Sequence, residues 1–119
     1  MKNDRVGFKY AIAGVYAALK TEHNIKIHFI IMFMTLFAGL LLGLTRIEWL
    51  FVLLAIGLVL ALELINTVVE LITDVLFEGK HETAKLIKDI SAAAVLVAAT
   101  FAALVGMIIF LPKLLEILI

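Results

Sequence analysis

The sequence has no cysteine, a single proline and few charged residues, which make up 17% of its 119 positions. The absence of cysteine excludes a disulfide framework, a thiolate zinc site and a cysteine nucleophile. The ten basic and ten acidic residues give a formal net charge of zero, so we expect no nucleic-acid partner. Neither glycine-rich phosphate loop, G-x-x-x-x-G-K-[ST] or G-x-G-x-x-G, occurs, so any nucleotide must be held by other contacts.

Hydrophobic residues account for 65% of the chain, whereas soluble domains contain roughly 45–50%. Three stretches lack acidic and basic residues: 19 residues between Lys26 and Arg46, 14 between Glu48 and Glu63, and 23 between Asp89 and Lys113. A helix that crosses the hydrocarbon of a bilayer needs about 20 mostly apolar residues. The first and third stretches are long enough, and the second spans only if its helix continues through Glu63 towards Asp74.

The distribution of basic residues favours three spans over two. With three spans, only Arg46 and Lys113 lie on one side, and the other side holds Lys2, Arg5, Lys9, Lys20, Lys26, Lys80, Lys85 and Lys88. With two spans, six basic residues lie on one side of the membrane and four on the other. Because basic residues accumulate on the cytoplasmic side of a membrane, we predict three spans with the eight bases in the cytoplasm.

The sequence therefore predicts an all-α integral membrane protein with one domain over residues 1–119. We expect an amphipathic helix on the membrane surface at about 6–19 and spans at about 24–44, 48–77 and 84–111. The first apolar run is too long for a signal peptide and is expected to stay as an anchor. Thr83 is expected to cap the third span and Pro112 to end it, because proline cannot continue a helix.

Small residues on two helix faces bear on packing. Gly39 and Gly43 stand four apart in the first span, and Ala92, Ala99, Ala103 and Gly106 share a face of the third. Small residues let membrane helices approach closely, so these faces favour contacts within or between subunits. We expect several copies of the chain to enclose a polar site.

That polar site is indicated by a stripe on the second span. Glu63, Asn66, Thr67, Glu70 and Asp74 fall within a band roughly 100° wide on a helix with 3.6 residues per turn. A charged side chain at the centre of a span costs about 2.5–3.5 kcal/mol on insertion scales. Three explanations are open: a polar network that fixes helix packing, a proton or cation pathway in a small transporter, and a site for a metal and phosphate groups.

Further polar residues stand at the cytoplasmic mouth, whereas the outer halves of the spans have almost none. They are Glu22, His23, Asn24, Lys26 and His28 at the start of the first span, and His81, Glu82, Lys85, Lys88 and Asp89 at the start of the third. A transport path would continue to the far side. A site open only to the cytoplasm favours chemistry that joins a water-soluble anion to a lipid hydroxyl.

Two motifs in this region resemble the signature of the bacterial membrane diacylglycerol kinase family. They are Glu63-x-x-Asn66-Thr67-x-x-Glu70-x-x-x-Asp74 and Lys88-Asp89-x-x-Ala92-Ala93-Ala94-Val95, and the likeness runs from about Phe8 to Lys113. Within the family, Thr21-Glu22-His23-Asn24 and Ile47-Glu48-Trp49 resemble the Gram-positive undecaprenol kinases. His28 departs from the Gram-negative members, which usually carry a second acid there.

The resemblance implies a homotrimer in the bacterial plasma membrane that uses MgATP to phosphorylate a lipid alcohol. By position, Glu63 resembles the catalytic carboxylate, Asn66 a site-orienting residue, and Glu22 and Glu70 the Mg²⁺ ligands. The residues that resemble the nucleotide-facing group are Asp74, His81, Lys88 and Asp89. The expected product is undecaprenyl phosphate from undecaprenol, and the alternative is phosphatidic acid from diacylglycerol.

Overall fold

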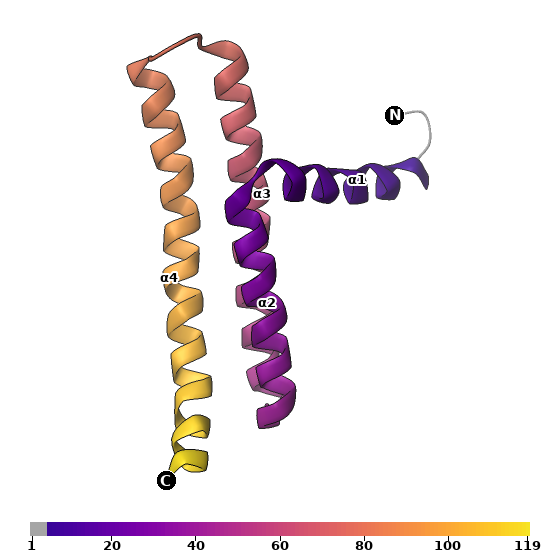
Figure 1. Ribbon diagram of the computed structural model, residues 1–119, viewed down its shortest axis with the longest axis vertical. Coiled ribbons are helices and arrows are strands. Elements are labelled where there is room, and N and C mark those ends of the chain that lie inside the picture. Colours follow the sequence, from indigo (N-terminus) through magenta and orange to yellow (C-terminus); the bar gives the residue numbers. More distant parts are fainter. Residues whose placement is uncertain (1–4) are drawn as a thin grey trace.

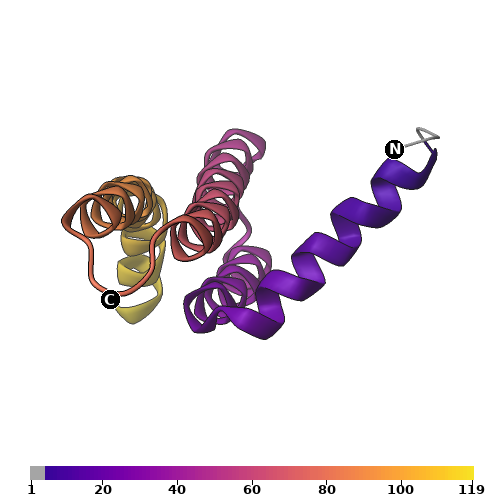
Figure 2. The same cartoon turned by 90° about the horizontal axis from the view of Figure 1, so that it is seen from above.

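The computed structural model describes residues 5–119, which form four helices (Figure 1). They are α1 (Arg5–Thr21), α2 (His23–Leu42), α3 (Arg46–Leu76) and α4 (Glu82–Leu118). Helices α2, α3 and α4 form an elongated bundle, and α1 projects sideways from the start of α2 (Figures 1 and 2). All three bundle helices are long and apolar enough to cross a membrane. The all-α class, the N-terminal helix and the three candidate spans are therefore confirmed.

The two ends of the bundle differ in character. The α1–α2 junction and the α3–α4 connection lie towards one end, which we call the basic end and which holds Lys20, Lys26, Lys80, Lys85 and Lys88. The opposite end carries Arg46 and Lys113. This division follows the expected asymmetry for the described residues, and Lys2 lies outside them.

The turn between α2 and α3 depends on two glycines and a threonine. Gly43 ends α2 in the left-handed conformation with φ of 69°, which favours glycine. Thr45 caps α3: its hydroxyl accepts from the Glu48 amide, and the Glu48 carboxylate accepts from the Thr45 amide. A methyl group on Gly39 would lie 2.7 Å from the Trp49 ring, so this glycine lets the ring pack across the turn.

The start of α4 differs from the prediction. His81, and not Thr83, is the cap: its Nδ1 accepts the Thr83 backbone N–H at 3.1 Å, and α4 begins at Glu82. An imidazole nitrogen can accept this bond just as a hydroxyl oxygen would. The His81 ring also lies against Phe77, with ring centroids 4.7 Å apart, so it anchors the connection after α3.

The end of α4 differs as well, because the predicted stop at Pro112 is wrong. The helix runs through Pro112 to Leu118. Proline removes one backbone hydrogen bond, but the ring lies on an exposed face, and membrane helices tolerate proline. In addition, Lys113 Nζ lies 3.0 Å from Glu48 Oε1, so an ion pair joins this last segment to the start of α3.

The apolar core lies near this end, away from the basic end. Leu44, Val52 and Ile109 are buried, and Trp49, Ile56, Val105 and Phe110 pack around them. Most other large apolar side chains of the bundle are exposed in one chain, as expected for surfaces that face lipid or further copies. Nothing lies within 4 Å of a methyl group placed on Gly106, so one chain leaves that small-residue face open.

Candidate active site

The polar stripe on α3 forms the buried centre of the candidate site. Glu63, Asn66 and Thr67 are only 4%, 8% and 5% exposed, although a single chain leaves most of α3 uncovered. The Thr67 hydroxyl donates to the Glu63 carbonyl at 3.0 Å, so its polar group is satisfied within the helix. Glu63 and Asn66 direct their polar groups to other side chains.

Helix α2 supplies two partners for the stripe. His28 Nε2 lies 3.0 Å from Glu63 Oε1, and Glu22, the residue that precedes α2, lies close enough to Glu70 for the two carboxyl groups to interact. The two pairs, which we call rungs, lie at successive levels between the antiparallel helices α2 and α3. Six residues forward from Glu22 lead to His28, and seven residues back from Glu70 lead to Glu63. Each step is about 10 Å along a helix axis. The structure therefore brings Glu22 and Glu70 near one another within one chain.

The Glu22–Glu70 rung is a concentration of negative charge. Burial raises the pKa of the Glu22 carboxyl, and the negative charges of Glu70 and Glu63 raise it further, together with the hydrogen bond to Glu70. Two carboxylates repel one another unless a proton or a cation lies between them. This rung is thus a candidate cation position.

Asn66 lies between Glu63 and Glu70 along α3 and has unused bonding capacity. Its Nδ2 donates to Glu70 Oε1 at 2.9 Å and orients that carboxylate. Its Oδ1 is buried and has no hydrogen-bond partner among residues 5–119. Because buried polar atoms are normally paired, this oxygen is free to accept a hydrogen bond from a ligand.

The basic side chains of α4 form two ion pairs beside the carboxylates. Lys88 pairs with Asp74 and joins α4 to the end of the stripe, whereas Lys85 pairs with Asp89 one turn along α4. Asp74, Lys85 and Asp89 are exposed, so they are open to a water-soluble ligand. The structure thus brings Lys88 and Asp74 together at the basic end.

Two of the predicted nucleotide-facing residues stand apart from the carboxylates. Among residues 5–119, no hydrogen bond or ion pair links His81 or Asp89 to Glu22, Glu63 or Glu70. His81 is engaged in the helix cap and Asp89 in its pair with Lys85. Both remain exposed at the basic end.

The carboxylates fit Mg²⁺ only as part of a metal–phosphate complex. Within the described part of the chain, no group of three or more His, Asp or Glu side chains is arranged to hold a metal ion. Mg²⁺ is commonly bound by one or two carboxylates, while phosphate oxygens and water complete its six ligands. Glu22 and Glu70, with the orphaned Asn66 oxygen nearby, match that donor set.

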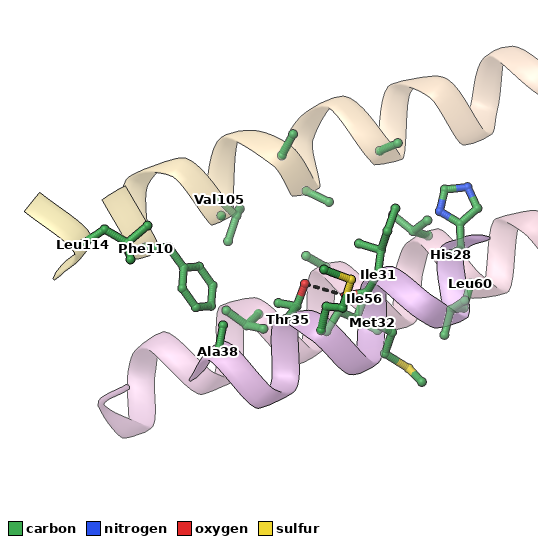
Figure 3. Close-up of a pocket in the computed structure, with 18 residues that line it drawn as sticks. His28, Ile31, Met32, Thr35, Ala38, Ile56, Leu60, Val105, Phe110 and Leu114 are labelled. Carbon is green, nitrogen blue, oxygen red and sulfur yellow. Dashed lines mark hydrogen bonds between the residues drawn. The ribbon is translucent and has the colours of Figure 1, made fainter. Parts of the chain in front are cut away.

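An apolar groove leads away from the site between α2, α3 and α4. Its volume is about 580 Å³, and its lining runs from His28 to Phe110 and Leu114 (Figure 3). The groove and the His28–Glu63 contact were not foreseen from the sequence. The contact follows from the antiparallel register: once Glu22 is placed opposite Glu70, His28 must face Glu63.

These features define a class: an all-helical membrane protein in which paired carboxylates and lysines at one end adjoin an apolar groove. The prokaryotic diacylglycerol kinase family matches residues 9–110, and the chain belongs to that family of lipid kinases. It is 38% identical to the undecaprenol kinase of Bacillus subtilis over 107 residues, which cover 90% of this chain and 87% of that protein.

Relatives that are named diacylglycerol kinases are similarly close. The Synechocystis protein is 40% identical over 115 residues, 96% of this chain and 66% of the relative. The Haemophilus influenzae protein is 34% identical over 94 residues, 76% of each chain. The prediction of the family and of a lipid kinase is confirmed, and membership of a kinase family implies the use of ATP.

Proposed function

We propose that the protein transfers the γ-phosphoryl group of MgATP to the hydroxyl of undecaprenol and makes undecaprenyl phosphate. The single observation that carries the proposal is the pair of rungs between α2 and α3. One rung offers two carboxylates for a cation. The next, about 10 Å deeper, offers a buried carboxylate that contacts His28 at the end of an apolar groove. A metal–phosphate complex and a lipid hydroxyl need these two environments side by side.

In the proposed reaction, Glu63 accepts the proton of the lipid hydroxyl. The lipid oxygen forms a bond to the γ-phosphorus, the bond from that phosphorus to the bridging oxygen breaks, and ADP leaves. Glu22 and Glu70 would hold Mg²⁺, which would supply neutralisation of the phosphate charge. Asn66 orients Glu70 through its amide, and Lys88 offsets further negative charge. Phosphoryl transfer depends mainly on such alignment and charge neutralisation.

The nucleotide-facing group comprises Asp74, His81, Lys88 and Asp89 at the basic end, which we propose faces the cytoplasm. We also propose that the working unit is a homotrimer with sites between subunits. The exposed basic-end residues and the uncovered faces of the bundle support this assembly, because one chain encloses the site only partly. Size-exclusion chromatography with light scattering should give three times the 13.1 kDa mass of one chain, after subtraction of detergent.

Labelled ATP, offered with undecaprenol or with diacylglycerol in mixed micelles, tests the function. We expect labelled lipid only with Mg²⁺, and a higher kcat/KM for undecaprenol. A higher value for diacylglycerol would reverse the acceptor assignment. Ion flux through liposomes without ATP, together with no labelled lipid, would favour a transporter instead.

A further inference from the structure

The apolar groove has one hydrogen-bonding end. Among its lining residues, only His28 and Thr35 carry a hydroxyl, amine or imidazole group. The Thr35 hydroxyl already donates to the Ile31 carbonyl at 2.8 Å (Figure 3). His28, by contrast, lies at the opposite end of the groove from Phe110 and Leu114. Of the two, only His28 directs its polar group to another helix, so it marks the polar end of the groove.

His28 also belongs to the proposed catalytic centre. Its Nε2 is 3.0 Å from Glu63 Oε1, and the two side chains are 23% and 6% exposed. A carboxylate this deeply buried needs a hydrogen-bond donor to fix its orientation. A single side chain, that of His28, therefore borders the groove and contacts the carboxylate.

Building on the proposed function, we propose that His28 is the positioning residue for Glu63. Its Nε2–H holds the carboxylate at the polar end of the groove, where a lipid alcohol whose hydrocarbon chain lies in the groove presents its hydroxyl. The groove volume of about 580 Å³ is within the roughly 300–1,000 Å³ typical of ligand pockets. His28 acts through Glu63 and needs no proton of its own to be transferred.

The arrangement favours an acceptor with few polar groups beside its hydroxyl. Ester carbonyls close to the hydroxyl would enter a region without an available side-chain donor, because the Thr35 hydroxyl donates to Ile31 and His28 Nε2–H is engaged with Glu63. They would therefore lose hydrogen bonds to water. A hydrocarbon chain with a terminal hydroxyl has no ester carbonyls and therefore loses no hydrogen bonds of this kind. The groove thus selects a long-chain alcohol over an acylglycerol.

Three substitutions of His28 test the positioning role. Leucine removes the donor, glutamine places an N–H donor at nearly the same reach as Nε2, and asparagine carries one that is one methylene too short. Because misplacing a catalytic group by about 1 Å can lower the rate 10²-fold, His28→Leu and His28→Asn should lower kcat about 10- to 100-fold. His28→Gln should stay within about threefold of the unsubstituted protein, and KM for MgATP should not change in any of the three.

Phe33→Leu is the matched control, because Phe33 is an exposed residue with an aromatic ring on the same helix and lies outside the groove and the site. It should leave kcat unchanged. Ala103→Leu, which fills the groove, should raise KM for the alcohol but not for MgATP, whereas Ala61→Leu, on an exposed face of α3, should do neither.

The outcomes separate this inference from the proposed function. Full activity of His28→Leu, or equal activity of the glutamine and asparagine variants, would overturn the positioning role while leaving a lipid kinase. An unchanged alcohol KM in Ala103→Leu, with loss of the assembled state, would assign the groove to a helix of another copy. If the unsubstituted protein phosphorylates no lipid alcohol, the proposed function itself fails.

Discussion

Replacing Glu63 by glutamine tests the proposed base with almost no change in shape. The residue is 4% exposed, so a smaller side chain would leave a cavity, whereas the amide of glutamine fills the same space. The glutamine oxygen can still accept from His28 Nε2, now 3.0 Å from the carboxylate. The variant loses only the ability to take a proton at this position.

We expect kcat of Glu63→Gln to fall by 10² to 10⁴, roughly the range for losing a general base. This corresponds to about 2.7–5.5 kcal/mol of activation free energy at 1.36 kcal/mol per factor of ten. Transfer of label from ATP to undecaprenol in micelles measures it, and light scattering of the same sample reports assembly. The exposed Glu78, in the α3–α4 connection, provides the control Glu78→Gln, which should keep full activity.

Two results would refute the reasoning for Glu63. Full activity of Glu63→Gln would remove the assignment of the base, because an amide cannot accept the hydroxyl proton. Loss of assembly without a measurable defect in the remaining assembled fraction would show that the carboxylate serves helix packing, which is one of the explanations that the stripe leaves open.

Three further predictions concern the metal, the nucleotide and the fold. Glu70→Gln should raise the Mg²⁺ concentration for half-maximal activity by roughly tenfold or more, and an unchanged Mg²⁺ titration would exclude Glu70 as a ligand. Lys88→Ala should raise KM for MgATP about 5- to 10-fold with little loss of stability, since its pair with Asp74 is exposed to solvent; an unchanged KM would exclude a nucleotide contact. Gly39→Ala should lower the free energy of unfolding by about 1–3 kcal/mol, because its methyl group meets the Trp49 ring. Gly57→Ala should leave the free energy of unfolding unchanged, because its methyl group meets nothing within 4 Å. Equal melting temperatures for the Gly39 and Gly57 variants would contradict the packing argument.

The helices were predictable because spans in a bilayer follow simple physical requirements. Length, apolar composition and the positions of Lys and Arg fix where helices cross, and the observed bounds differ from the predicted ones by only a few residues, except at Pro112. That exception has a physical cause. The rule that proline ends a helix reflects a lost hydrogen bond, whereas the ion pair of Lys113 with Glu48 and the leucine-rich segment stabilise the helix beyond it.

Residues of the candidate site were predictable where they lie along one face of a single helix. The stripe from Glu63 to Asp74 is visible because its members repeat along one helix. The contact between His28 and Glu63 joins two helices, and its prediction requires the register of α2 against α3. One pair within a chain fixes that register, but the resemblance did not say which subunit places Glu22 beside Glu70. The second pair therefore could not be predicted from it.

The register of α2 against α3 also explains how the Glu63 carboxylate is retained within the apolar part of α3. Helix α1 leaves the bundle at the level of the Glu22–Glu70 rung, with Phe8, Ile12 and Tyr16 exposed. If α1 lies on the membrane surface, as its exposed apolar residues indicate, that rung lies near the phosphate-accessible boundary. Glu63 then lies about 10 Å deeper, on the apolar side of that boundary. A lipid hydroxyl can reach this depth without leaving the membrane, whereas ATP stays on the aqueous side of the boundary. In the proposed reaction, the spacing of the two rungs therefore keeps the lipid in the membrane and the nucleotide in water. The two substrates meet only at the transferred phosphoryl group.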